Sequence, residues 1–155
     1  MTSSEKRAFR AWPPSIATRF IEDFEGRRLV AYKCSAGKWT IGVGHTIGVK
    51  KGDTCTDLQA DEWLVEDIRE VVETIGRYIT PDVTKGQFIA LVSLGFNFGA
   101  MNVITKCPKL IKKLNTSDFE GAAREFLDCD KVGGVAVAGL TRRRKAEARI
   151  FLGKE

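Results

Sequence analysis

Residues 25–46 read EGRRLVAYKCSAGKWTIGVGHT, and this stretch decides the fold prediction. Residues 29–32 are apolar, residues 38–41 form a second run rich in β-formers, and Ser35-Ala36-Gly37 between them is a turn signal. Two short runs that are separated by a few turn residues predict a β-hairpin. The sequence on both sides of this stretch has the spacing of ordinary amphipathic helices.

The same stretch contains four side chains that are able to carry chemistry. They are Glu25, Cys34, Thr40 and His45, the only histidine of the chain. Because strands and tight turns hold side chains at fixed angles, we expect the first three to converge on one cleft.

Glu25 is expected in the last turn of a helix. Ser15 is the predicted cap of this helix, and Gly26 is its predicted end. The macrodipole is negative at a helix C-terminus, so this position disfavours a carboxylate anion and favours a proton donor. Without its neighbours, a glutamate at a helix end would be read as an ordinary surface carboxylate.

The composition predicts one globular domain. The chain has 155 residues, of which 43% are hydrophobic and 29% charged. No apolar run approaches the ~18 residues that span a bilayer, and residues 1–15 lack the apolar core of a signal peptide. We therefore expect a protein that is made, and at first kept, in the cytoplasm. The net charge of +5 favours anionic partners without selecting one.

The four cysteines stand at positions 34, 55, 107 and 129, too far apart for a CxxC motif. Their spacing does not define a disulfide pairing. We expect Cys55, Cys107 and Cys129 to be buried or idle thiols, whereas Cys34 differs because of its neighbours.

Further helices are expected along the rest of the chain. A capping box from Thr56 to Gln59 opens the longest helix, which Pro81 ends, and Thr84 caps the next, which ends at residues 96–99. Three more helices are predicted: residues 107–115, a helix opened by a capping box at residues 117–120, and a last helix capped by Thr141 and stopped by Gly153. Tyr78 and Leu127 are expected on buried helix faces, and residues 131–140 are expected to form a loop.

Taken together, these residues resemble the phage-type lysozymes, or endolysins, of glycoside hydrolase family 24. That family usually has Glu, eight residues, Asp, five residues and Thr, followed by IGxGHT. In this sequence Glu25, Cys34 and Thr40 occupy the three positions. The segments QFIALVSLGFNFG (87–99), KLIKKLN (109–115) and GLTRRRKAEARIFL (139–152) resemble later family blocks, so the resemblance covers residues 15–152.

The resemblance implies an α+β, lysozyme-like fold that is mostly helical. A single domain would span residues 1–155, with a flexible N-terminus over 1–14. A small β-hairpin lobe (26–58) and a larger helical lobe (81–155 plus 15–25) would be joined by a connecting helix (57–80). The active site would lie in the cleft between the lobes.

The resemblance also implies a function: an endolysin that hydrolyses the β-1,4 bond between N-acetylmuramic acid and N-acetylglucosamine in bacterial peptidoglycan and so lyses the host. It implies no metal and no organic cofactor. Glu25 would be the general acid, and Thr40 would position the attacking water. Asn97 and Arg143 would line the substrate site, with Arg143, in preference to Arg142, pairing with Glu25. His45 and Arg142 would be structural residues near the site.

The family also implies how the protein would be used. It would be a monomer that waits in the host cytoplasm and reaches the periplasm and cell wall with the help of a holin. Neither nucleic acid nor a stable membrane anchor is expected among its partners.

Cys34 departs from the family pattern, which usually has Asp at this position. Arg27, Arg28 or Lys33 are candidates for lowering the pKa of the thiol, and Glu25 for raising it. Two mechanisms stay open: attack by water with base assistance and inversion, which the retained Thr40 favours, or a covalent thioglycoside with retention. A disulfide to another cysteine would inactivate such an enzyme.

Two other classes of function are considered. Replacement of the usual Asp by Cys34 could leave a peptidoglycan-binding module without catalysis. The net charge and the basic run at residues 142–145 could instead indicate a nucleic-acid-binding helical protein, but the interleaved aromatic and basic residues of strand-binding folds are missing.

Overall fold

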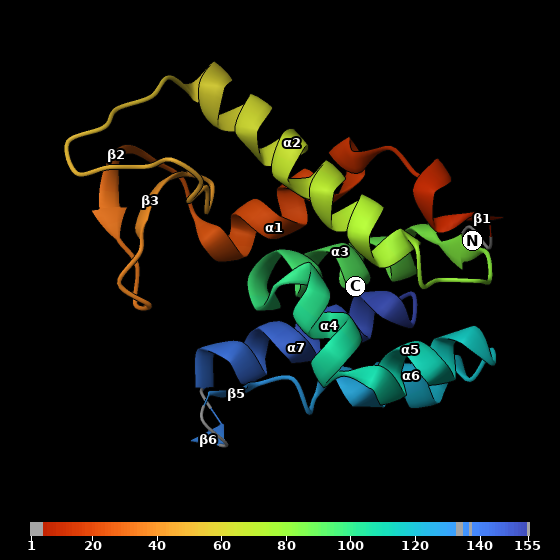
Figure 1. Cartoon of the computed structure of the whole chain (residues 1–155). Coiled ribbons are helices and arrows are strands. Elements are labelled where there is room, and N and C mark those ends of the chain that lie inside the picture. Colours follow the sequence, from red (N-terminus) through yellow and green to blue (C-terminus); the bar gives the residue numbers. More distant parts are fainter. Residues whose placement is uncertain (1–4, 133–134, 137, 155) are drawn as a thin grey trace.

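The computed structural model describes residues 5–132, 135–136 and 138–154 (Figure 1). Its elements, in chain order, are β1 (Lys6–Arg7), η1 (Phe9–Ala11), η2 (Pro14–Ala17), α1 (Thr18–Glu25), β2 (Arg28–Lys33), β3 (Trp39–Gly42), α2 (Asp57–Gly76), β4 (Val83–Thr84), α3 (Lys85–Phe98), α4 (Ala100–Lys106), α5 (Pro108–Asn115), α6 (Phe119–Phe126), β5 (Lys131–Val132), β6 (Val135–Ala136) and α7 (Ala138–Phe151).

Helices dominate the described residues, and the strands form three two-stranded antiparallel sheets: β1 with β4, β2 with β3, and β5 with β6. The predicted α+β class is therefore confirmed. The β2–β3 hairpin lies at one end of the molecule. Helix α1 leads into it, and α2 runs from that end toward the other (Figure 1).

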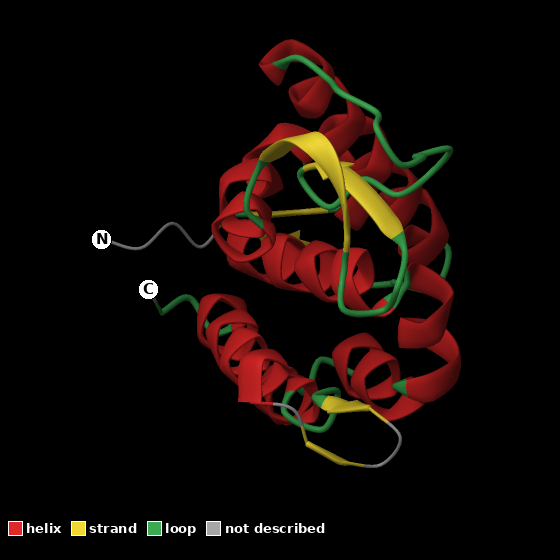
Figure 2. Cartoon of the chain, turned by 90° about the vertical axis from the view of Figure 1, so that its left-hand side faces the viewer, coloured by secondary structure: helices red, strands yellow, loops and turns green. Residues whose placement is uncertain are grey.

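The predicted hairpin of residues 25–46 is present. Tyr32 faces Thr40 and Lys33 faces Trp39 across the two strands, and the N–H of Gly37 donates to the carbonyl of Cys34 in the turn. Figure 2 places this hairpin in front of the helices. Its fixed turn sets the directions of the side chains at positions 34 and 40.

The capping box of α2 is present, with the Thr56 hydroxyl accepting from the N–H of Gln59 and the Gln59 side chain accepting in return. The helix ends at Gly76, however, before the predicted stop at Pro81. Asn115 of α5 binds the carbonyl of Tyr78 at 2.8 Å and the N–H of Thr80 at 3.1 Å, so these backbone groups are satisfied outside a helix. Tyr78 is consequently exposed, and its predicted burial was wrong.

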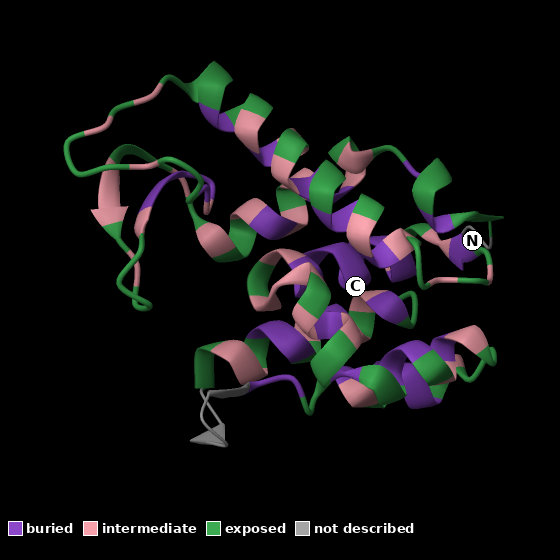
Figure 3. Ribbon diagram, in the orientation of Figure 1, coloured by how far each residue is buried: buried purple, intermediate pink, exposed green. Residues whose placement is uncertain are grey.

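Helix α3 is the centre of the core. Its residues from Gln87 to Gly95 are all buried, which is typical of a helix covered on all sides (Figure 3). Thr84 caps it as predicted, and Gln87 completes a capping box that the sequence reading did not identify. Among the described residues no single helix has the length and apolarity to cross a bilayer; α3 and α4 reach both only when taken together across the 96° bend between them.

The expectation of a flexible N-terminus was wrong for residues 5–14; residues 1–4 lie outside the described part of the chain. Phe9 and Trp12 are buried, and the indole N–H of Trp12 donates to the carbonyl of Val83 at 2.9 Å. The N-terminal segment therefore packs beside the start of α3.

Three predicted caps were wrong. Ser15 lies in η2, and α1 has no side-chain cap. Asp118, rather than the capping box at 117–120, caps α6 through the N–H of Gly121, because Ser117 has a φ of 63°. Thr141 lies inside α7, which begins at Ala138, and its hydroxyl donates to Asp130.

Other expectations for the C-terminal half also need correction. Leu127 lies just beyond α6 and is exposed. The expected loop over 131–140 contains the short β5–β6 pair and the start of α7, while residues 133, 134 and 137 lie outside the described part. Helix α4 was missed because the sequence reading ended one helix at residue 99 and started the next at 107.

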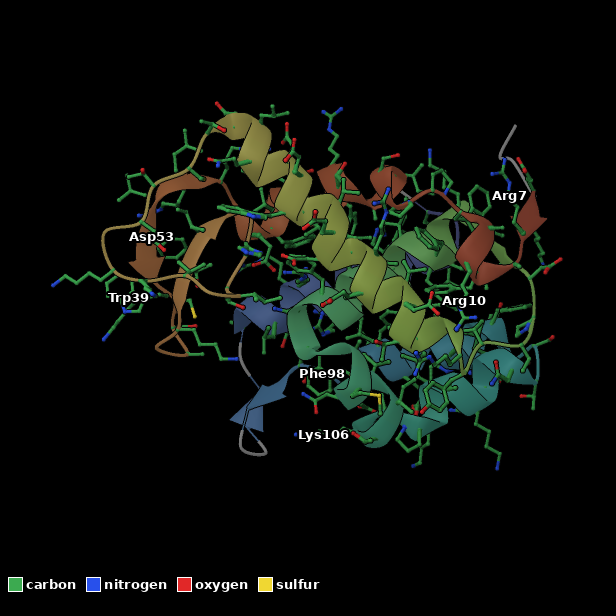
Figure 4. The ribbon with its side chains drawn as sticks, turned by 45° about the horizontal axis from the view of Figure 1, so that its top comes forward. Arg7, Arg10, Trp39, Asp53, Phe98 and Lys106 are labelled. Carbon is green, nitrogen blue, oxygen red and sulfur yellow. A yellow bond between two sulfur atoms is a disulfide. The ribbon has the colours of Figure 1, made fainter. Side chains whose placement is uncertain are left out.

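Cys107 and Cys129 are buried and form a disulfide, so they are not idle thiols. The bond lies beside Lys106 and joins the residue before α5 to the segment that follows α6 (Figure 4). Cys34 and Cys55 are free thiols.

Candidate active site

Glu25 ends α1 and lines a cleft of about 450 Å³. Gly26 follows it with a φ of 73°, a backbone conformation that glycine adopts without strain, and this ends the helix at the edge of the cleft. The cleft is lined from the hairpin side by Tyr32, Cys34, Ser35, Ala36, Lys38 and Thr40, and from the junction of α3 and α4 by Phe96, Asn97, Phe98, Gly99 and Asn102. The three residues expected to converge, Glu25, Cys34 and Thr40, thus share one cavity.

Arg143 of α7 contacts Glu25 but is not among the residues that line the cleft, so the structure places it behind the proposed acid. Its Nη1 donates to Oε2 of Glu25 at 2.5 Å, and its guanidinium lies 5.2 Å from the ring centre of Phe24. Arg143 is buried, whereas the neighbouring Arg142 is exposed. A cation here offsets the unfavourable helix-end location of the Glu25 carboxylate.

Cys34 lies at the end of β2 and is half-buried. Hydrogen bonds lower the pKa of its thiol, the largest contribution coming from the backbone N–H of Lys38 and smaller ones from Ala36 and Thr40. The turn itself therefore favours the thiolate.

The side chains that the sequence suggested as causes of this shift are engaged elsewhere. Arg27 binds Glu22, Asp57 and Asp61. Arg28 lies over the ring of Tyr32, and Lys33 over the ring of Trp39. These three cations are therefore not what lowers the pKa of the Cys34 thiol. The hydrogen bonds of the turn lower it instead.

Thr40 is buried at the base of the cleft, and its hydroxyl donates to the carbonyl of Lys38 at 3.0 Å. This bond fixes the orientation of the side chain and leaves the lone pairs of its oxygen as acceptors. A water held by Thr40 would have a defined position relative to Cys34 and Glu25.

His45 is turned toward α2. Its Nδ1 lies 2.8 Å from Oδ2 of Asp67, and its ring stacks on Trp63 with centroids 4.6 Å apart. Burial raises the pKa of Asp67 despite the nearby histidine. His45 thus ties the end of the hairpin to α2, and it is not among the residues that line the cleft.

Asn97 lines the cleft near the end of α3, and its side-chain oxygen accepts a hydrogen bond from Nη2 of Arg144. The amide group is therefore oriented by a fully buried cation. This leaves the Asn97 amide nitrogen as the donor available to a ligand.

Sequence reasoning missed three residues behind the cleft: Ser93, Arg144 and Glu147, all fully buried. The spacing of Glu147, three residues after Arg144 and four after Arg143, was a usable signal, because such pairs meet on one helix face. Ser93 gave no such signal, since nothing in an apolar helix pattern shows which partner a lone serine meets. The described residues include no group of three or more His, Cys, Asp or Glu side chains placed to hold a metal ion.

Comparison with known proteins gives a consistent result. The family model described as phage lysozyme matches residues 22–147. The chain is 42% identical to an endolysin of Acyrthosiphon pisum secondary endosymbiont phage 1 over 135 residues, which is 84% of this chain and 91% of the relative. It is 37% identical to an endolysin of Bacillus phage B103 over 85% of this chain and about half (51%) of that relative.

Solved structures that are similar to this chain include phage endolysins and a muramidase domain. An endolysin from Escherichia coli O157:H7 phage FAHEc1 superposes with a TM-score of 0.80 and 31% identity, covering 98% of this chain and 96% of that one. The muramidase domain of SpmX from Asticaccaulis excentricus superposes with a TM-score of 0.78 and 31% identity, covering 88% and 94%. The expected fold is thereby confirmed.

Proposed function

The chain belongs to the phage lysozyme family, and from that premise we propose that it hydrolyses the β-1,4 bond between N-acetylmuramic acid and N-acetylglucosamine. At the coarser level it is a peptidoglycan-hydrolysing endolysin, a glycoside hydrolase of the lysozyme type. What we propose beyond this is the glycosidic bond that is cleaved and the residues that cleave it.

One observation supports the proposal most strongly. Glu25, Cys34 and Thr40 line one cleft, and the buried Arg143, which does not line it, contacts the Glu25 carboxylate at 2.5 Å. A glycosidase needs a carboxylic acid on one side of the bond and a second group that handles water or the sugar carbon. Glu25, Cys34 and Thr40 supply this set, and Arg143 holds Glu25 in place.

In the proposed reaction Glu25 gives its proton to the glycosidic oxygen as the bond to the sugar C1 breaks. Thr40 holds a water whose oxygen attacks C1, and the Cys34 thiolate takes the proton that this water loses. The anomeric configuration is inverted. The hydrogen bonds that lower the pKa of the Cys34 thiol support this role, because they favour the thiolate that a base requires.

The alternative mechanism uses the same residues in another order. The Cys34 thiolate would attack C1 while Glu25 protonates the departing glycosidic oxygen, which leaves a thioglycoside. Water would then attack C1, with the Glu25 carboxylate taking its proton and the Cys34 thiolate leaving. That path retains the configuration, so the product distinguishes the two.

Clearing of a suspension of purified peptidoglycan tests the catalytic assignment. Glu25→Gln should abolish clearing, and Cys34→Asp, which restores the usual family residue, should keep it. Glu62→Gln, which makes the same chemical change on the exposed face of α2, is the matched control. Lysis by a folded Glu25→Gln protein would refute the role of Glu25.

A second function, binding of peptidoglycan without cleavage, is favoured by one feature only, the Cys34 at the usual Asp position. Sedimentation with peptidoglycan in the absence of released sugar would identify it. For the living context, we propose that the protein acts as a monomer, waits in the host cytoplasm and depends on a holin to reach the wall.

A further inference from the structure

A buried cluster of charged residues lies directly behind the cleft. Arg143, Arg144 and Glu147 belong to α7, and Ser93 belongs to α3, which packs along α7 (Figure 1). Arg143 is 5% exposed and the other three are completely buried. Of this cluster only Nη1 of Arg143 contacts the proposed acid, Glu25. The other charged groups have no part in the cleavage reaction proposed above.

Glu147 is the centre of this cluster. Its Oε1 lies 2.5 Å from Nη1 of Arg144, and its Oε2 lies 2.5 Å from Oγ of Ser93 and 3.4 Å from Nε of Arg143. Burial raises the pKa of Glu147, while Arg144, Ser93 and Arg143 oppose this by stabilising its anion. A buried carboxylate with partners on both oxygens is a fixed point in the structure.

Glu147 and Ser93 bind the side of the Arg143 guanidinium that faces away from Glu25. Its Nε lies within 3.4 Å of both Ser93 Oγ and Glu147 Oε2, and its Nη2 donates to the carbonyl and the hydroxyl of Ser93. Only Nη1 is directed at Glu25. Because the guanidinium is rigid and planar, holding the Nε and Nη2 side determines where Nη1 points.

The carboxylates of the array are shared between two arginines. Arg143 pairs with Glu25 and Glu147, and Arg144 pairs with Glu147 and is also influenced by the buried carboxylate of Asp130. Without Glu147 the buried Arg143 would be paired with Glu25 alone. A general acid must keep its proton at working pH, and unopposed cations would favour its anion.

We propose that Glu147 is a positioning residue for the reaction: through Arg143 it fixes the Glu25 carboxylate, and it offsets the positive charge of the arginine that faces this carboxylate. This inference rests on the proposed function, in which Glu25 is the acid. Glu147 itself does not line the cleft.

The ionisable groups around the pair come from several elements. Arg143 faces Glu25 from α1 and Glu147 from its own helix, and α3 contributes the uncharged Ser93. Arg144 faces Glu147 from the same helix, and the buried Asp130 acts on Arg144 in turn. On the hairpin side Tyr32 is close enough for Glu25 to contribute, after burial, to its raised pKa, and Cys34 lines the same cleft. Removal of the charge of Glu147 should therefore alter the position and the electrostatic surroundings of the Glu25 carboxylate through Arg143.

The test is the variant Glu147→Gln, which keeps the size of the side chain and removes its charge. The initial rate of peptidoglycan clearing is measured from pH 4 to pH 9 and divided by the wild-type rate at each pH, which cancels changes in the substrate. We expect the alkaline limb of the profile to move to lower pH by roughly one unit. At neutral pH the rate should fall roughly tenfold.

Glu125→Gln is the matched control. Glu125 is a partly buried carboxylate on α6 that pairs with Lys113 at 3.7 Å and has no contact with Arg143. Its profile should coincide with that of the wild type. A folded Glu147→Gln enzyme whose rate is unchanged, or reduced equally at every pH, would overturn the proposal, because a purely structural glutamate predicts one of these results.

Ser93→Ala decides the matter if Glu147→Gln does not fold. It removes one hydrogen bond from Glu147 and two from Arg143 without removing a charge. We expect a smaller rate loss with normal binding to peptidoglycan, and a wild-type rate would overturn the proposal. Glu25→Gln is assayed in parallel to separate the proposed function from the role of Glu147. Lysis by Glu25→Gln would refute the proposed function. An inactive Glu25→Gln together with a wild-type pH profile for Glu147→Gln would refute only the role of Glu147.

Discussion

The backbone of Gly44 lies against the carboxylate of Glu25. A Cβ at position 44 would stand 2.9 Å from Oε1 of Glu25 and 3.0 Å from the ring of Phe96. Gly44 also has a φ of 65°, which side chains rarely adopt. Position 44 therefore requires glycine for two reasons: its positive φ, and the lack of space for a side chain beside the carboxylate of the proposed acid.

Gly44→Ala should lower the rate of peptidoglycan clearing roughly tenfold or more, because the added methyl group displaces the Glu25 carboxylate. Gly48→Ala is the control, since Gly48 has a φ of 73° but nothing within 4 Å of its Cβ position. Both variants carry backbone strain from a positive φ, and Gly44→Ala adds the close contacts with Glu25 and Phe96, so its melting temperature should fall further than that of Gly48→Ala. Equal activity of the two variants would show that the contact with Glu25 does not matter.

The two free thiols should differ in reactivity. The turn lowers the pKa of Cys34, whereas burial raises the pKa of Cys55. As pH rises, the Cys34 thiolate should form first, and alkylation by iodoacetamide should start at lower pH at Cys34 than at Cys55. Peptide mass spectrometry after timed alkylation from pH 6 to pH 10 measures both sites in one sample. Faster alkylation of Cys55 would contradict the assigned hydrogen bonds of the turn.

Alkylation of Cys34 should also abolish clearing if its sulfur is the base or the nucleophile. The variant Cys55→Ser removes the second site and keeps the test specific. Unchanged activity after complete alkylation of Cys34 would exclude the thiol from both mechanisms.

Stability should depend on the caps of α3. Thr84 accepts from the N–H of Gln87 at 3.1 Å, and Gln87 accepts from the N–H of Thr84 at 2.9 Å. Thr84→Ala should reduce the free energy of unfolding by about 1 kcal/mol, and Thr84→Ser should restore most of it. Urea unfolding followed by circular dichroism measures both. A loss as large for Thr84→Ser as for Thr84→Ala would mean that the hydroxyl is not the stabilising group.

The sequence was most informative where a local signal determines the structure. The turn at Ser35-Ala36-Gly37, the capping box at Thr56 and the glycine after Glu25 each depend on neighbouring residues, and each is present. The end of α2 was not readable, because Asn115, 37 residues beyond Tyr78, satisfies the backbone there.

The same distinction holds for the site. Glu25, Cys34 and Thr40 lie within 16 positions of one motif and could be named from it. The hydrogen bonds between Ser93 and Glu147, and between Arg144 and Asn97, join residues about 50 positions apart. A single sequence without relatives gives no means of pairing such residues, so the support behind Arg143 became visible only in three dimensions.

The most direct test of the account is the identity of the first product released from purified peptidoglycan. Digests are followed by NMR during the first turnovers and by mass spectrometry with and without borohydride reduction. The account predicts fragments that end in reducing N-acetylmuramic acid and appear first as the α-anomer, because water attacks with inversion. A 1,6-anhydro end, a reducing N-acetylglucosamine end or an initial β-anomer would contradict it.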